Sequence, residues 1–278
     1  MGIKRPHEAM EDQNSQAPQS PFMSMFESFR AELDEHHDRR ERIIKASRDI
    51  TAASKKIIFT LQRLRTINQP LPQHINKSNA QYYTIIKTAY ASISKDVQNL
   101  NAYRYARQVS GGNQEYIEAA SFEHYLTTAS LLTYEEACAK VRALDSEGPG
   151  VDLGYEDYVL GIYDMTGELM RFAITAMATS GALPAPSSSE NENDMEVDSA
   201  AQKRNILTDL RALRSALESL NTNGTGPFGK EADKKADVMR QSVEKVERAL
   251  YGLTVRGAER PKGWMPDLSE SRAVEVEG

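Results

Sequence analysis

The sequence predicts an all-α fold with seven helices, on three observations. Apolar residues recur every three or four positions through most of the chain, which is the spacing of one face of an α-helix. Proline and glycine are concentrated in short stretches that separate these segments. No segment shows the sustained apolar–polar alternation of a β-strand, and the chain has no internal repeat. We therefore expect a bundle of long antiparallel helices.

The first predicted helix covers residues 26–66 and contains neither proline nor glycine. About 40 residues of helix would be about 60 Å long. A chain of this size does not cover such a helix along its whole length. Part of its apolar stripe, which begins with Phe26, Phe29 and Leu33, should therefore pack on another chain.

Six further helices follow. Pro70 and Pro72 separate the first helix from the second, and we expect the pair Gly111-Gly112 to end the second. A capping box at Thr133 and Glu136 opens the fourth. The six predicted helices cover residues 75–109, 114–130, 133–144, 152–179, 201–221 and 231–254.

These helices form a single predicted domain at residues 22–257. Residues 1–21 are polar and are expected to be disordered. Residues 181–199 combine prolines, serines and five acids, so we interpret them as a disordered insert within the domain. Residues 258–278 form a short acidic tail.

The composition favours an intracellular protein of a reducing compartment, and we expect it in the cytoplasm and nucleus. The single cysteine, Cys138, excludes an internal disulfide. No apolar run approaches the roughly 18 residues of a membrane span, and the N-terminus lacks a signal-peptide core. Although the net charge is −6, residues 39–65 contain nine basic and two acidic residues. This stripe either contacts nucleic acid or is an ordinary solvated helix face.

Four carboxylates are the strongest chemical signal. Glu115 and Glu118 are three residues apart and Asp164 and Glu168 four apart, so each pair lies on one helix face. Acids on largely apolar helices are rarely buried unless they are paired or bind a metal. If the two helices face each other, the oxygens would suit Mg²⁺ or Mn²⁺ better than Zn²⁺. Alternatively, these acids are solvated or paired with arginines of the same region, namely Arg104, Arg107 and Arg171.

A segment just before Glu115 alternates aromatic and basic residues. Such a pattern suits stacking on unpaired bases together with phosphate contacts, so Arg104, Tyr105 and Arg107 are candidate nucleic-acid-binding residues. The alternative is that Tyr103 or Tyr105 belongs to the core and the arginines to the surface. The chain contains no HExxH or CxxC motif, and no Glu-x-x-His motif of a di-iron bundle.

Several blocks of the sequence resemble the translin family, and the chain looks like a fungal member. They include SRDIT at residues 47–51, QEYIEA at 114–119 and GELMR at 167–171, of which the last two are quite specific, with a weaker block at 243–251. The resemblance covers most of residues 26–257. The insert at 181–199 and the pair Arg104-Tyr105 depart from the animal pattern, which leaves the nucleic-acid-binding surface open.

The resemblance implies a subunit that assembles with translin into a hollow hetero-octamer. It also implies a Mg²⁺-dependent endoribonuclease of single-stranded RNA, with some action on single-stranded DNA, that serves RNA silencing and precursor-tRNA processing. The family's catalytic acids fall on Glu115, Glu118 and Asp164, with Glu168 as a nearby fourth acid; all four are candidate metal ligands. Two other functions stay open: a non-catalytic scaffold that binds single-stranded nucleic acid, and a purely structural helical partner.

Overall fold

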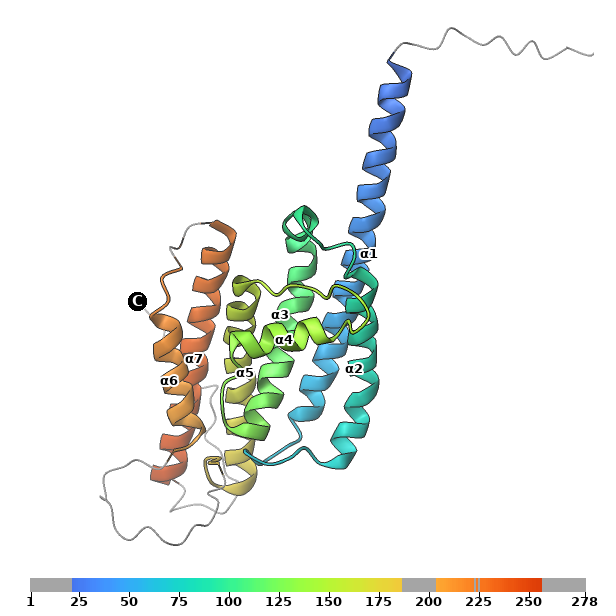
Figure 1. Cartoon of the computed structure of the whole chain (residues 1–278). Coiled ribbons are helices and arrows are strands. Elements are labelled where there is room, and N and C mark those ends of the chain that lie inside the picture. The colour runs from blue at the N-terminus through green and yellow to red at the C-terminus, as the bar shows by residue number, and fades with distance from the viewer. Residues whose placement is uncertain (1–21, 187–203, 223, 225, 257–278) are drawn as a thin grey trace, which may run out of the picture. The chain divides into compact units, whose positions relative to one another are not determined.

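The computed structural model describes residues 22–186, 204–222, 224 and 226–256 (Figure 1). It divides into two compact units, one ending at Glu41 and the other beginning at Arg42. Residues 1–21, predicted to be disordered, the acidic tail at 258–278 and most of the 181–199 insert lie outside the described residues.

Seven helices are present in this part of the chain, and it contains no strand, which confirms the predicted all-α class. Their bounds are α1 Met23–Leu61, α2 Gln73–Ile93, α3 Leu100–Thr128, α4 Tyr134–Ala143, α5 Tyr155–Ser180, α6 Ile206–Glu218 and α7 Gly226–Arg256. None of the described helices combines the length and the hydropathy needed to cross a bilayer.

The first unit contains the N-terminal half of α1, and none of its described side chains is buried. Phe26, Phe29 and Leu33 are more than half exposed, and the two phenylalanine rings meet edge to face with centroids 6.3 Å apart. This unit therefore has an apolar stripe that is open to solvent in the isolated chain.

In the second unit, α5 packs between α3 and α7, and α6 packs on α7 (Figure 1). The sequence of α5 explains this position, because its apolar residues occur on most of its circumference. The rings of Phe122 on α3 and Phe172 on α5 are fully buried and meet edge to face at 6.3 Å. The C-terminal half of α1 belongs to the same core through a stripe that includes Ile43, Ile50 and Ile57.

Two predicted boundaries are wrong. The predicted 75–109 helix is interrupted at residues 94–99, although no glycine or proline occurs there. Tertiary contacts hold the interruption: Asp96 accepts two hydrogen bonds from the Arg42 guanidinium at 2.9 and 3.0 Å, and Gln98 donates to the Gly150 carbonyl at 2.8 Å. Asn99 takes a positive φ of 54°, which asparagine tolerates better than most residues.

Gly111-Gly112 does not end a helix, because α3 continues through both residues. The Gly112 N–H donates to Ser47 Oγ at 3.0 Å, and a Cβ at Gly112 would lie 3.0 Å from the Ser47 carbonyl oxygen. The glycine therefore permits a close approach of α3 to α1 rather than a turn.

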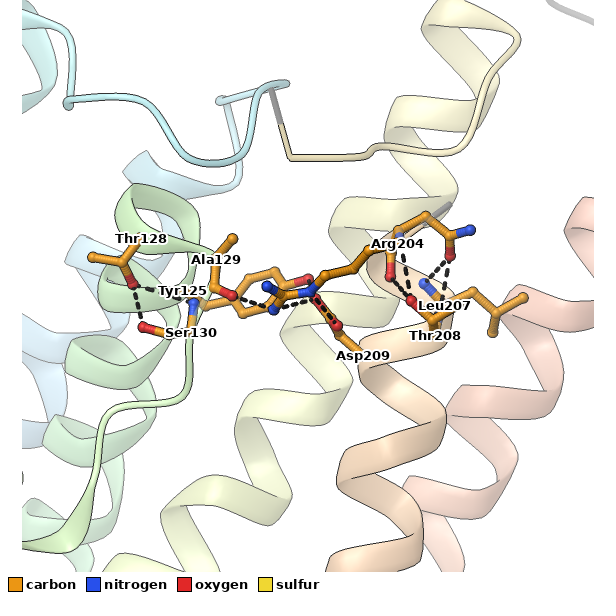
Figure 2. Close-up of polar contacts among 9 residues, drawn as sticks. Tyr125, Thr128, Ala129, Ser130, Arg204, Leu207, Thr208 and Asp209 are labelled. Atoms are coloured by element: carbon orange, nitrogen blue, oxygen red, sulfur yellow. Dashed lines mark hydrogen bonds and ion pairs between the residues drawn. The ribbon is translucent and has the colours of Figure 1, made fainter. Parts of the chain in front are cut away.

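The start of α6 is fixed to the end of α3 by a polar cluster (Figure 2). The Arg204 guanidinium donates to both carboxylate oxygens of Asp209 at 2.8 and 3.0 Å and also to the carbonyl of Ala129. The hydroxyl of Tyr125 donates to the same Asp209 carboxylate at 2.9 Å. One acid thus joins α3 and α6 through two donors.

Further hydrogen bonds lie on either side of the segment 187–203, at Pro184 and at Asn205 and Ile206. Asn205 caps α6 by accepting from the N–H groups of Leu207 and Thr208 at 2.9 and 3.0 Å. The N–H of Ile206 donates to the carbonyl of Pro184 at 3.1 Å. The chain therefore leaves and re-enters the described helical unit at adjacent points.

Candidate metal and nucleic-acid site

The four predicted acids lie beside a close contact between α3 and α5. A Cβ at Gly161 of α5 would be 2.8 Å from the Gln114 carbonyl oxygen and 2.9 Å from the Ile117 side chain. Only glycine permits this approach without a shift of one helix. Glu115 and Glu118 follow from this point along α3, and Asp164 and Glu168 follow along α5.

Glu118 is the acid most affected by its surroundings. Its exposed fraction is 9%, and no hydrogen bond or ion pair to its carboxylate is found among the described residues. Burial, followed by the charges of Glu115, Asp164 and Glu168, raises the pKa of Glu118 to about 8. The carboxylates of both helices therefore act on one another.

Two lysines from other helices serve as counter-ions. Lys55 Nζ of α1 lies 3.7 Å from Glu115 Oε2, and Lys235 Nζ of α7 contacts Asp164 Oδ2. Burial raises the pKa of the Glu115 carboxyl, and Lys55 opposes that rise. Burial also raises the pKa of the Asp164 carboxyl, against the effect of Lys235. In both cases desolvation outweighs the lysine.

Glu168 has different partners. The side-chain amide of Gln62 donates to Glu168 Oε2 at 2.7 Å and to the Glu168 carbonyl at 2.9 Å. Arg171 Nη1 lies 3.4 Å from Glu168 Oε1, so the alternative of an arginine ion pair is realised for this acid. Arg171 is itself 67% exposed, which limits the strength of that pair.

No group of three or more His, Cys, Asp or Glu side chains in the described part of the chain is arranged to hold one metal ion. The chemistry of the donors nevertheless fits a hard cation, because all four are carboxylates and Glu118 has no competing partner. A cation at this position would replace charge that Lys55 and Lys235 now supply.

The candidate nucleic-acid residues need one correction. Tyr105 is only 4% exposed and belongs to the core, so its ring offers no face to a base. Tyr103 is 90% exposed, and Arg104 and Arg107 are also exposed. The aromatic candidate in this segment is therefore Tyr103, because the helical turn directs neighbouring positions to different faces.

Sequence reasoning did not identify Lys235 and Gln62 as partners of these acids. It also missed Gln114, whose Oε1 lies 3.2 Å from Lys235 Nζ. Lys235 occurs in a charged stretch of α7, yet it is three residues after buried Ala232 and four before buried Met239. That spacing places it beside the core-facing stripe and is the one signal that could have singled it out. Gln62 and Gln114 carry no comparable signal, since amides are common on helix surfaces.

The fold and this cluster define an all-helical protein with an acidic centre between two packed helices. The sequence pattern of the Translin family matches residues 38–257, and the chain belongs to that family.

Curated relatives agree with this assignment. The chain is 32% identical over 283 residues to translin-associated protein X of Mus musculus, which covers 95% of this chain and 89% of the relative. It is 30% identical over 236 residues to the translin-associated protein X homolog of Schizosaccharomyces pombe, covering 84% and 89%. Similarity to Homo sapiens translin is lower, at 25% over 228 residues, covering 81% of this chain and 89% of the relative.

Solved structures share the fold. The crystal structure of AfC3PO superposes with a TM-score of 0.54 at 18% identity, covering 83% of this chain and 97% of that one. Apo-NeC3PO gives a TM-score of 0.53 at 15% identity, covering 84% and 99%. At these identities the likeness concerns the fold alone.

Proposed function

We propose that this chain is the catalytic subunit of an endoribonuclease that assembles with translin and cleaves single-stranded RNA with the help of Mg²⁺ or Mn²⁺. The names of its relatives support a translin partner, since the most similar proteins quoted above are described as translin-associated. A nucleic-acid ligand is compatible with the fold, because AfC3PO has also been solved with duplex RNA. Single-stranded DNA is a second expected ligand.

The observation that carries the catalytic assignment is the buried acidic cluster. Packing four carboxylates against one another costs stability unless a cation balances them. Here Glu118 is buried without a partner, and two lysines balance Glu115 and Asp164. A structural role does not require such an arrangement, since an apolar contact between α3 and α5 would be at least as stable.

The chain's residues divide the chemistry among them. Glu115, Glu118 and Asp164 would hold the cation, with Glu168 as a fourth oxygen donor. When bound, such a cation neutralises charge on the phosphoryl oxygens and activates a water or hydroxyl nucleophile. Lys55 and Lys235 orient Glu115 and Asp164 and place positive charge beside the scissile phosphate. Arg104 and Arg107 contact the phosphates of the bound strand.

The test is cleavage of single-stranded RNA by the complex co-purified with translin. We expect Glu118→Gln and Asp164→Asn each to lower the cleavage rate roughly 100-fold or more while assembly persists. Glu123→Gln is the matched control, because Glu123 is another largely buried acid of α3, bonded to Tyr83 at 2.7 Å. Near-normal cleavage by both site variants at saturating Mg²⁺ would contradict the catalytic assignment, and full activity after chelation would contradict metal dependence.

A non-catalytic scaffold is the second candidate, and one observation favours it. Two of the carboxylates are paired with lysines, and the described acids are not grouped as ligands of one ion. The same assay separates the two functions. A scaffold binds single-stranded RNA with and without Mg²⁺ and leaves it intact.

A further inference from the structure

A large pocket lies beside the acidic cluster, between the N-terminal parts of α3, α5 and α7. Its volume is about 780 Å³, which is within the range of small-molecule sites in proteins. Its walls include the apolar residues Leu153, Leu160 and Phe228. A flat apolar group of moderate size would be desolvated there.

The floor of the pocket is a polar network centred on Asp157. Its carboxylate accepts from Ser110 Oγ at 2.5 Å and from the Gln114 amide at 3.3 Å on Oδ1, and from the Asn113 amide at 2.8 Å on Oδ2. A carboxylate has about four acceptor positions, two on each oxygen. Both positions on Oδ1 are used, so one position on Oδ2 is left for a ligand. A ligand that reaches the floor should therefore present an N–H group.

The rim of the pocket carries Tyr103 and Arg107. The Tyr103 side chain is 90% exposed, although such a ring is usually at least half covered in a folded protein. Both side chains can stack on a planar ring, and Arg107 can also contact a phosphate.

The pocket shares a wall with the acidic cluster. Lys235 Nζ, which contacts Asp164, lies 3.2 Å from Gln114 Oε1 and 3.5 Å from the Leu160 carbonyl oxygen. Gln114 and Leu160 both line the pocket. A group bound in the pocket is therefore one side chain away from the carboxylate of Asp164.

We propose that this pocket binds one unpaired nucleobase of the single-stranded substrate, on the strand that passes the acidic cluster. The base would stack on Tyr103 and donate an N–H to Asp157. The acids at the pocket, which include Asp152, Glu156 and Glu231, keep the phosphates outside, where Arg107 meets them. This inference rests on the proposed function for the position of the strand, but binding of the base needs no cleavage.

The experiment measures RNA affinity of the translin complex in EDTA, so that neither cleavage nor a metal contributes. The probes are short single-stranded oligoribonucleotides in which one position at a time is abasic. In the unsubstituted protein, we expect one abasic position to weaken binding roughly 5- to 150-fold, as loss of one stacked base does. Tyr103→Ala should weaken binding of intact RNA similarly and should abolish the effect of that abasic position. Tyr103→Phe should behave as the unsubstituted protein.

Two further variants test whether the pocket itself binds the base. Ala106→Trp places a ring in the pocket from its exposed wall and should mimic Tyr103→Ala. Tyr155→Ala is the control, because Tyr155 is 70% exposed and stacks on Tyr134 outside the pocket, so its loss should leave RNA affinity unchanged. The proposal is overturned if the loss of RNA affinity caused by Tyr103→Ala and the loss caused by an abasic position add at every position of the RNA. It is also overturned if Ala106→Trp prevents co-purification with translin, since a partner protein would then fill the pocket.

Discussion

At the scale of residues, the acidic cluster depends on cations supplied by distant parts of the chain. Lys55 comes from α1 and Lys235 from α7, whereas the acids they contact come from α3 and α5. The spacing of the acids was visible in the sequence, but the lysines were not, because helix periodicity says nothing about which helices meet. The sequence also did not show which of Tyr103 and Tyr105 is buried, since each has polar and apolar neighbours.

Removal of the Lys235 charge should destabilise the metal-free protein. In Lys235→Met, Asp164 would face the other acids without its counter-ion. The two side chains are 16% and 35% exposed, so the loss should be smaller than that of a fully buried pair. We expect the Tm of the complex in EDTA to fall by about 2–10 °C.

The matched control is Lys234→Met, which removes a lysine that is 76% exposed and pairs with Glu231 at 3.7 Å. Its Tm should change by less than about 2 °C. Mn²⁺ should restore more stability to Lys235→Met than to Lys234→Met, because the cation replaces the missing charge. Equal Tm values for the two variants would mean that Lys235 is not a counter-ion of the cluster.

Glu123, which lies outside the acidic cluster, should make the stability of the folded protein depend on pH. Burial raises the pKa of its carboxyl above the ordinary 4.5, although the Tyr83 hydroxyl opposes the rise. The folded protein therefore keeps a proton that the unfolded chain loses, and this stabilisation disappears as the pH rises from 4.5 through the raised pKa. Glu123→Gln cannot lose a proton, so its Tm should match the unsubstituted protein at low pH and exceed it increasingly above pH 4.5. A Tm difference that is the same at every pH would contradict this account.

At the scale of elements, a single glycine sets the separation of α3 and α5. Gly161 lies against the backbone of Gln114, one residue before Glu115. Gly112 allows a similar approach of α3 to α1. From sequence, glycines within a predicted helix indicate either a helix end or a close contact. Gly111-Gly112 was predicted to be a helix end, but Gly112 makes a close contact. Which of the two applies depends on the neighbouring helix and cannot be read from one segment.

Gly161→Ala should separate the helices and destabilise the protein. The new Cβ would lie 2.8 Å from a backbone oxygen that cannot rotate away, so we expect a loss of about 1–3 kcal/mol and a lower cleavage rate. Gly167→Ala in the same helix is the control, because a Cβ there would meet nothing within 4 Å. It should stabilise the helix by about 0.5–1 kcal/mol. Thermal unfolding of the two variants decides the matter, and equal stabilisation by both would exclude a tight contact at Gly161.

At the scale of the whole molecule, the all-α class followed from apolar periodicity. The predicted number of helices agrees with the structure, although the break expected at Gly111-Gly112 lies at residues 94–99 instead. The four acids could not be assigned to a site by spacing alone, because acids at the same spacing also occur on solvated helices. Their neighbours were apolar, and this was the physical signal that favoured burial. The interruption at residues 94–99 was missed because contacts of Asp96 and Gln98 with distant residues produce it.

The exposed stripe of the first unit should carry part of the proposed contact with translin. Phe22, Phe26, Phe29 and Leu33 are spaced by four, three and four residues, which is the spacing by which one helix packs on another. All four side chains are at least half exposed in the isolated chain. Replacement of Phe26, Phe29 and Leu33 by serine should therefore reduce co-purification with translin strongly, while the helical unit that begins at Arg42 keeps its circular dichroism and its Tm.

The control changes the polar face of the same stretch. Glu27, Arg30 and Asp34 are exposed, and their replacement by serine alters helix propensity by a similar amount without removing apolar area. This variant should assemble normally. Because both triple variants place three serines in the same stretch of one helix, a difference in sedimentation or co-purification between them isolates the apolar stripe. Normal assembly of the Phe26, Phe29 and Leu33 variant would show that translin binds elsewhere.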